Sequence, residues 1–239
     1  MSETDLFSTQ VIFEDNHLIA INKKPGQITQ GDKTGDVPLG DLVKDFLKHK
    51  YNKTGNVFCG TIHRIDRPVS GVVLFAKTGK ALERMNELFR SREVSKTYWA
   101  VVKNKPAKPE DTLVHYLIKD ESKNKSRASL QPKGNTLRCE LKYSTIAHSD
   151  NYNLLEVDPL TGRHHQIRVQ LAAIGCPIKG DLKYRSERSN PDGSIHLHAR
   201  KLVFVHPVKN EKVELIADPP DESLWNYFLK ATHAEPKEK

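Results

Sequence analysis

The alternation of apolar and polar residues along the chain predicts a protein built largely of short strands. Runs of β-branched and aromatic residues that end at turn-forming residues are typical of strands. We expect a hairpin over 11–22 and strands over 72–76, 97–102, 137–146, 153–157, 195–205 and 213–217. The stretch 103–134 contains prolines and a lysine-rich run at 119–127, so we expect it to form connections and an exposed basic loop.

Apolar residues spaced three and four apart predict four helices. The first covers 39–47, the second begins at a Thr78 cap, the third begins at a Thr161 cap and ends at Gly175, and the last covers 224–228. Strands outnumber these helices and do not alternate strictly with them. The pattern therefore indicates an α+β fold with a mixed, largely antiparallel central sheet and flanking helices and loops.

The chain has the composition of a globular protein and the length of one large domain or two small ones. Its 239 residues are 37% hydrophobic and 28% charged, which is too apolar for a disordered chain. We expect a single domain over 10–232, with an N-terminal tail at 1–9 and a C-terminal tail at 233–239.

Charge and targeting signals narrow the class of protein. The excess of 38 Lys and Arg over 30 Asp and Glu gives a net charge of +8, which favours a polyanionic partner, although a merely soluble basic protein would look the same. The sequence has no apolar run long enough for a membrane helix and no signal peptide at its start. Its 3 cysteines are an odd number without a C-x-x-C pair, as in a reducing compartment. We expect a cytoplasmic protein, active as a monomer.

The first candidate for chemistry is the polar cluster that lies between apolar flanks at 60–71. It contains His63, Arg64, Asp66 and Arg67 and leads directly into the predicted strand 72–76. A loop held by a rigid scaffold is a common place for reactive groups. The alternative is a solvated turn on which Asp66 forms an ordinary ion pair with a neighbouring arginine.

The second candidate is the segment 160–170, which contains two arginines and two histidines. On a helix, His164 and Arg168 would share one face, and the free amides at the helix start favour an anion. A polar helix face without a ligand is the alternative reading. A metal site is a further reading of the histidine-rich set His164, His165, Asp181, His196, His198 and His206. No metal-binding motif is present, which favours ordinary core or RNA-facing histidines instead.

Taken together, these segments resemble the RluA-type family of RNA pseudouridine synthases over nearly all of residues 10–217. The family signature H-R-L-D-x-x-T-S-G stands here as His63-Arg64-Ile65-Asp66-Arg67-Pro68-Val69-Ser70-Gly71, with Ile65 and Val69 departing from it. The segment 95–100 looks like the family's K-x-Y-x-A strand. The segment 160–168 looks like its L-x-T-G-R-x-H-Q-I-R stretch, with an opening one residue shorter. The segments 14–26, 175–181 and 197–199 also match in family order, while Gln170 stands where the family often has histidine.

The resemblance implies an enzyme that isomerises specific uridines of large-subunit rRNA or of tRNA to pseudouridine without a cofactor or a metal. It implies Asp66 as the nucleophile, Tyr98 as the ring that stacks on the flipped uracil and moves a proton, and Arg168 as the cation that pairs with Asp66. Whether the aspartate attacks the sugar or the base stays open. RNA contacts are expected from Arg64, which would fill the space left by the flipped base, and from His63, Arg67, Arg163, His164, Gln166, Lys123 and Lys125.

Two other readings and one expectation about domains complete the picture. A non-catalytic RNA-binding protein could keep the fold, but it would be expected to lose the nucleophile. A metal-dependent nuclease could use the histidines, and a chelator would then abolish its activity. Many members of the family carry an S4-type domain before the catalytic one, and since the pattern begins near residue 10 we expect none here.

Overall fold

The computed structural model describes residues 7–31 and 34–233, and the chain divides into two compact units. Unit 1 comprises Met1–Lys96 and Ala199–Asp218, and unit 2 comprises Thr97–His198 and Pro219–Lys239. The predicted tails lie mostly outside the described residues, but Phe7 is buried and its ring centroid lies 5.7 Å from that of Phe46. The single domain over 10–232 stays a prediction.

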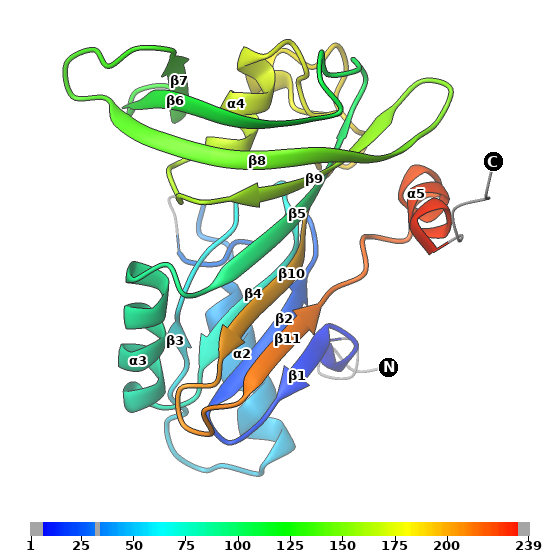
Figure 1. Ribbon diagram of the computed structural model, residues 1–239. Helices are drawn as coiled ribbons and strands as arrows, with labels where there is room; N and C mark the ends of the chain where they lie inside the picture. The colour runs from blue at the N-terminus through cyan, green and yellow to red at the C-terminus, as the bar shows by residue number, and fades with distance from the viewer. Residues whose placement is uncertain (1–6, 32–33, 234–239) are drawn as a thin grey trace. The chain divides into compact units, whose positions relative to one another are not determined.

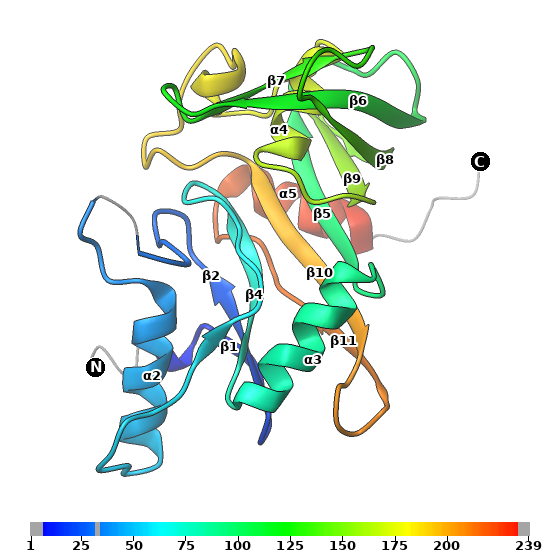
Figure 2. The same ribbon diagram turned by 90° about the vertical axis from the view of Figure 1, so that its left-hand side faces the viewer.

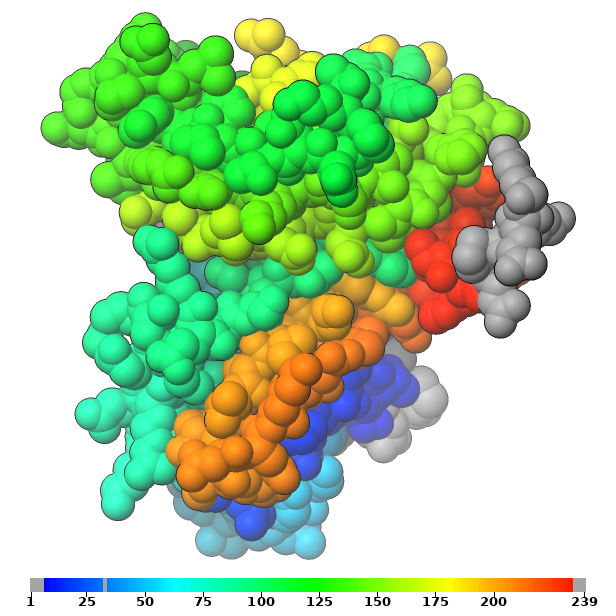
Figure 3. All heavy atoms as spheres, viewed as in Figure 1, coloured from blue at the N-terminus to red at the C-terminus, as the bar shows by residue number. Residues whose placement is uncertain are grey.

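The sheet of unit 1 forms most of its core. Its strand order is β1 (Val11–Glu14), β2 (Leu18–Lys23), β4 (Ser70–Ala76) and β10 (Leu197–Val205), with β3 (Gly60–Thr61) beside β4 and β11 (Lys212–Ile216) beside β10. The hairpin predicted over 11–22 is confirmed, since β1 and β2 pair antiparallel. Figure 3 shows β1 and β11 side by side at the surface of this unit.

Strand β4 is buried along its whole length because both of its faces are covered, and it is apolar from Val72 to Ala76. Val72 and Leu74 pack into one cluster with Met85 of helix α3 (Gly79–Arg90). Phe75 points the other way, toward Gly40 of helix α2 (Leu39–Lys50). The two helices accordingly lie on either side of β4 (Figure 2). Two-sided burial explains why this strand reads as a continuous apolar run.

Helix α3 confirms the cap that the sequence predicts. Thr78 has extended backbone angles, and its hydroxyl accepts a hydrogen bond from the backbone N–H of Ala81. This bond satisfies one of the donors that the first turn of a helix leaves unpaired. The helix then buries Ala81 and Met85 against the sheet.

The sheet of unit 2 contains two strands that the sequence analysis misses. Its order is β5 (Ser95–Val102), β9 (Asn153–Pro159), β8 (Leu137–His148), β6 (Glu110–Asp120) and β7 (Lys125–Ser129), as Figure 1 shows. The expectation of connections and an exposed loop over 103–134 is therefore wrong for 110–120 and 125–129, while 121–124 is an exposed turn. Strands β6 and β7 form an antiparallel hairpin whose turn has Asn124 at φ 43°.

The hairpin was missed because charged residues obscure the alternation that marks its one apolar face. Leu113 and Leu117 are buried on β6, while the residues between them are polar or half-exposed. Alternation of this kind is the signal of a half-buried strand. The charged residues of 119–127 hide it, because they occupy the end of β6, the turn and the start of β7.

The two faces of this sheet differ in chemistry. Directly paired residues of adjacent strands point to the same face, and Tyr98 pairs with Val157, which pairs with Tyr143. Two and four residues before Tyr143 on β8 are the buried Leu141 and Cys139, and Cys139 belongs to one apolar cluster with Val169 of helix α4 (Gln166–Ala173). Tyr98 therefore lies on the face of the sheet that α4 covers.

The opposite face of the unit 2 sheet carries carboxylates. A hollow there is lined by polar residues of β6, β8 and β9, among them Glu110, Lys142, Glu156 and Asp158. Thr97 donates to Asp158 at 2.7 Å, and the indole N–H of Trp99 lies 3.3 Å from Glu156. Unit 2 thus has a face with Tyr98 and α4 and a face with acidic side chains.

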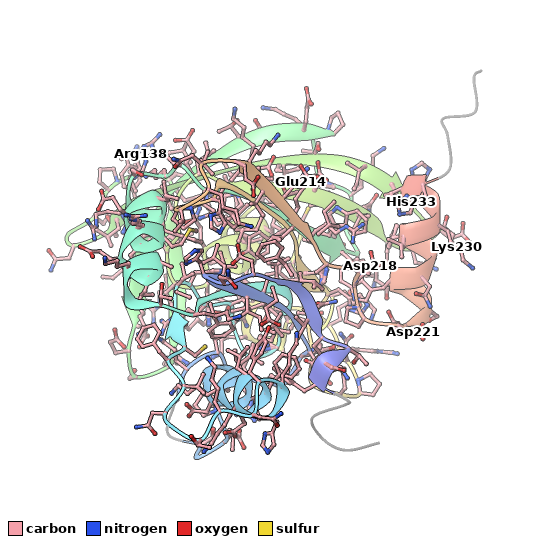
Figure 4. All side chains as sticks on the ribbon, turned by 90° about the horizontal axis from the view of Figure 1, so that it is seen from below. Arg138, Glu214, Asp218, Asp221, Lys230 and His233 are labelled. Carbon is pink, nitrogen blue, oxygen red and sulfur yellow. The ribbon has the colours of Figure 1, made fainter. Side chains whose placement is uncertain are left out.

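Helix α5 (Ser223–His233) completes unit 2. Trp225 and Phe228 pack with Trp99 of β5 in one apolar cluster. Lys230 and His233 are exposed in the last turn, where Figure 4 labels them. Cations at this end complement the partial negative charge of the helix C-terminus. Among the described residues, none of the helices has the length and apolarity that a membrane crossing requires.

The predicted cap of the third helix is wrong. Helix α4 begins at Gln166 after His165, whose backbone is left-handed with φ 54°. Thr161 lies five residues earlier, and its hydroxyl bonds to the side-chain oxygen of Gln166 at 2.7 Å instead of capping a backbone N–H. The predicted end is confirmed, since the helix stops at Ala173 and Gly175 follows with φ 79°.

The α+β class is confirmed. Four helices of eight residues or more flank the sheets in the part of the chain that is described. All strand pairs whose register is given above are antiparallel.

Candidate active site

Asp66 lies in the loop between β3 and β4, and this loop is fastened to unit 1 on both sides of it. Ile65 and Val69 are buried, so the apolar residues of the segment anchor it to the core. The hydroxyl of Thr29 donates to the carbonyl of Ile65, and the backbone N–H of Val69 donates to the carbonyl of Asp66 at 3.0 Å. The side chain of Asp66 is half-buried.

The two departures from the family signature are explained by this packing. Ile65 and Val69 are 8% and 2% exposed, so both positions use an apolar side chain as an anchor. The glycine that ends the signature is required by the fold. Gly71 has φ 114°, and a Cβ atom there would lie 2.3 Å from the carbonyl oxygen of Ala199 on β10.

A buried lysine, which the sequence analysis does not single out, supports the same loop. Lys23 at the end of β2 has no exposed surface, and its ammonium donates to the carbonyls of Lys24, Gln27 and Arg67 at 3.0, 2.8 and 3.1 Å. Its pKa is lowered to about 7, chiefly by burial. The negative charge of Asp66 opposes this shift, and the positive charge of Arg67 adds to it. Lys23 therefore connects the Asp66 loop to β2 by a hydrogen bond and interacts electrostatically with Asp66.

A signal for Lys23 exists in the sequence. It follows Ile19 and Ile21 at the spacing of one strand face, so it stands where a buried apolar residue is expected. A lysine at such a position is almost never fully buried without partners.

His63 faces the interior of unit 1. Its Nε2 accepts a hydrogen bond from the backbone N–H of Leu74, and its ring stacks on Phe89 with centroids 5.0 Å apart. Burial, together with the positive charge of Lys96, lowers its pKa to about 3. A neutral ring with Nε2 as acceptor adds no positive charge for RNA. An RNA contact by His63 stays a prediction.

The two arginines of the signature are both exposed. Arg67 forms an ion pair with Asp36 at 2.6 Å, and both side chains of this pair are about half-exposed. Their exposure is compatible with the predicted RNA contacts, which stay predictions.

Arg168 is held in unit 2 by a buried carboxylate. Its Nε and Nη2 donate to the two oxygens of Asp181 at 2.7 and 2.9 Å, and the two side chains are 6% and 1% exposed. A guanidinium has five N–H donors in one plane, so a carboxylate on this edge directs the remaining donors away from Asp181. The structure thus gives Arg168 one fixed orientation.

Other residues of the second candidate segment hold the turn before α4. Gln166 accepts from the hydroxyl of Thr161 and from the backbone N–H of Arg163, and it donates to the carbonyl of Glu140. His164 lies 2.9 Å from the hydroxyl of Ser126. Arg163 is exposed, and the RNA contacts predicted for these residues stay predictions.

The two lysines of the basic run that are predicted to contact RNA lie on the β6–β7 hairpin. Lys123 is exposed in its turn, while Lys125 begins β7 and is half-buried. The position that departs from the family, Gln170, is buried in α4 and donates to the carbonyl of Leu113 at 3.0 Å.

The histidines considered for a metal site have structural partners. His196 stacks on Trp225 and lies 3.1 Å from Glu222, and burial lowers its pKa to about 4. His206 lies 3.0 Å from Asp15. Within residues 7–31 and 34–233, no three His, Cys, Asp or Glu side chains are arranged to hold a metal ion.

Comparison with known proteins gives a consistent result. The family model for RNA pseudouridylate synthase matches residues 17–173. The ribosomal large subunit pseudouridine synthase C of Rickettsia bellii is 32% identical over 213 residues, covering 88% of this chain and 68% of the relative. The tRNA pseudouridine synthase C of Haemophilus ducreyi is 31% identical, covering 91% of this chain and 95% of the relative. Several other relatives are longer, and the chain spans 62% to 69% of their length.

A solved structure supports the fold. Human RNA Pseudouridylate Synthase Domain Containing 4 superposes with a TM-score of 0.78 at 23% identity, covering 96% of this chain and 95% of that one. The family model and the two relatives confirm the RluA-type resemblance and the predicted enzyme class: the chain belongs to the RNA pseudouridylate synthase family and is an RNA pseudouridine synthase.

Proposed function

We propose that the protein converts uridines of rRNA or tRNA to pseudouridine with Asp66 as its covalent nucleophile. The observation that carries the proposal is the rigid setting of Asp66, on a loop anchored by buried apolar residues and by the buried ammonium of Lys23. A carboxylate must be ionised to act as a nucleophile, and a nearby cation favours that form. The substrates follow from the relatives, which are named for ribosomal and transfer RNA.

Unit 2 supplies the other groups that the reaction needs. Tyr98 lies on the face of its sheet that α4 covers, and α4 carries Arg168 in an orientation fixed by Asp181. We propose that Tyr98 stacks on the flipped uracil and moves a proton, and that Arg168 pairs with Asp66. The reaction breaks the bond between uracil N1 and the ribose and forms a bond from C5 to the same carbon. The hydrogen on C5 leaves as a proton and N1 takes up a proton, so the reaction is an isomerisation with no net redox change.

The experiment compares Asp66→Asn with the wild-type enzyme in a tritium-release assay. Transcripts of rRNA and tRNA labelled at C5 of uridine release tritium when pseudouridine forms. We expect Asp66→Asn to fold and bind RNA but to release none, because an amide is not a nucleophile of this kind. The matched control Asp41→Asn changes a half-exposed carboxylate of α2 and should react at the wild-type rate. Tritium release by Asp66→Asn would refute the assignment.

A further inference from the structure

Tyr184 is a buried aromatic residue of unit 2 to which the proposed mechanism gives no role. It ends the short helix η1 (Leu182–Tyr184) and is 3% exposed. Its hydroxyl accepts from the backbone N–H of Ser126 on β7 at 2.8 Å and lies 2.9 Å from Nδ1 of His165. A tyrosine hydroxyl has one hydrogen and two lone pairs, so it can make both bonds at once. It therefore joins β7 to the start of α4.

The start of α4 needs such support because its backbone is strained. His165 has φ 54°, a left-handed conformation that residues other than glycine rarely adopt. Such a conformation persists only where the surroundings fix it. Here the ring of His165 stacks on His164 at 3.8 Å, and Ser126 donates to the carbonyl of His164 at 2.7 Å. Tyr184 and β7 together hold the turn from which α4 and Arg168 extend.

The ring of Tyr184 also lies against two cations. The guanidinium carbon of Arg168 is 5.2 Å from the ring centroid, and Nζ of Lys125 is 5.1 Å from it. Both distances fall within the range in which a cation is attracted to an aromatic ring. Arg168 is thus fixed by Asp181 and by Tyr184, three residues further along the same segment. Lys125 lies over the ring from β7. The next residue is Ser126, whose backbone N–H donates a hydrogen bond to the Tyr184 hydroxyl.

We infer that Tyr184 is a positioning residue that couples Lys125 of the β6–β7 hairpin to Arg168. Lys125 then supports turnover through the tyrosine as well as RNA affinity through its charge. Its role differs from that of an exposed lysine, whose charge acts on RNA affinity alone. The inference rests on the proposed function, because it takes Arg168 as a member of the active site.

The test measures the single-turnover rate of tritium release at saturating labelled transcript, and the RNA dissociation constant separately. Tyr184→Phe removes the hydroxyl bonds and should lower the rate about 2- to 10-fold. Lys125→Met should lower it about 5-fold, and Lys125→Arg, which keeps a cation over the ring, should restore it. The matched control is Lys133→Met, which removes an exposed lysine of the loop between β7 and β8 and should leave the rate unchanged.

A double-mutant cycle separates coupling from two independent effects. Tyr184→Leu should lower the rate more than Tyr184→Phe, and in that background Lys125→Met should have no further effect on it. Should Tyr184→Leu fail to fold, the comparison of Lys125→Met with Lys125→Arg decides.

Two results would overturn the coupling. One is a wild-type rate in a folded Tyr184→Phe variant, and the other is a Lys125→Met rate equal to that of Lys133→Met. If Asp66→Asn is inactive and either of these results is found, only this inference is refuted. An active Asp66→Asn variant removes the proposed function.

Discussion

Replacing Lys23 with methionine should change how the stability of the protein depends on pH. The ammonium of Lys23 is fully buried and donates to three backbone carbonyls, and burial lowers its pKa from 10.5 to about 7. In the unfolded chain the same group keeps its ordinary pKa. Between these two values the unfolded state binds a proton that the folded state has released, so folding becomes more favourable as the pH rises.

The magnitude follows from that interval. One pH unit corresponds to about 1.36 kcal/mol, so the interval from about 7 to 10.5 corresponds to roughly 5 kcal/mol in full. Over the practical range from pH 7 to pH 9, the wild-type protein should gain about 2 kcal/mol relative to Lys23→Met. The variant has no titrating group at this position and lacks the gain.

Urea denaturation of both proteins at several values of pH measures the difference. Lys24→Met serves as the control, because it removes the neighbouring lysine, which is exposed. Its stability should run parallel to that of the wild type. Parallel curves for Lys23→Met as well would refute the reasoning, since Lys23 would then keep its proton at pH 9. The three carbonyls and the charge of Asp66 would in that case outweigh the cost of burial.

Two further changes test the surroundings of the active site. Asp181→Asn keeps the volume of the side chain but removes the charge that orients Arg168. It should lower the free energy of unfolding by about 1.5–3 kcal/mol and also slow tritium release. The control is Asp150→Asn at an exposed residue, and equal rates for the two variants would contradict the role of Asp181. His63 has its pKa lowered to about 3 by burial, so the wild-type protein should lose stability as the pH falls from 6.5 toward 3, by at most about 1.4 kcal/mol per pH unit. His63→Phe should lack this loss, and acid denaturation curves of unchanged shape would show that the ring is not held neutral.

The sequence predicts much of unit 1 because its elements carry strong local signals. The apolar run at 72–76 and the Thr78 cap each lead directly to the observed strand and helix. The sequence shows the loop with Asp66 as a polar cluster between apolar flanks, and the structure adds that Ile65 and Val69 of this loop are buried. Here local propensity and tertiary packing agree.

The contacts that shape the site are less visible in the sequence because they join distant segments. Asp181 and Arg168 are 13 residues apart, and Tyr184 meets Ser126 across 58 residues. No spacing rule links such positions. Thr161 shows the converse, since its local pattern fits a helix cap but its hydroxyl bonds to a side chain within the turn. Hydrogen bonds of this kind compete with secondary structure and are settled by the fold.

The acidic face of the unit 2 sheet has a consequence for how a polyanion approaches this unit. Glu156 and Asp158 lie on the side of the sheet opposite to Tyr98, while the protein as a whole carries a net charge of +8. Phosphates are repelled from the carboxylate side, so the sheet is electrostatically polarised across its thickness. We expect an RNA that diffuses toward this unit to be turned before contact, so that encounters that would hide the face with Tyr98 are disfavoured without any specific recognition.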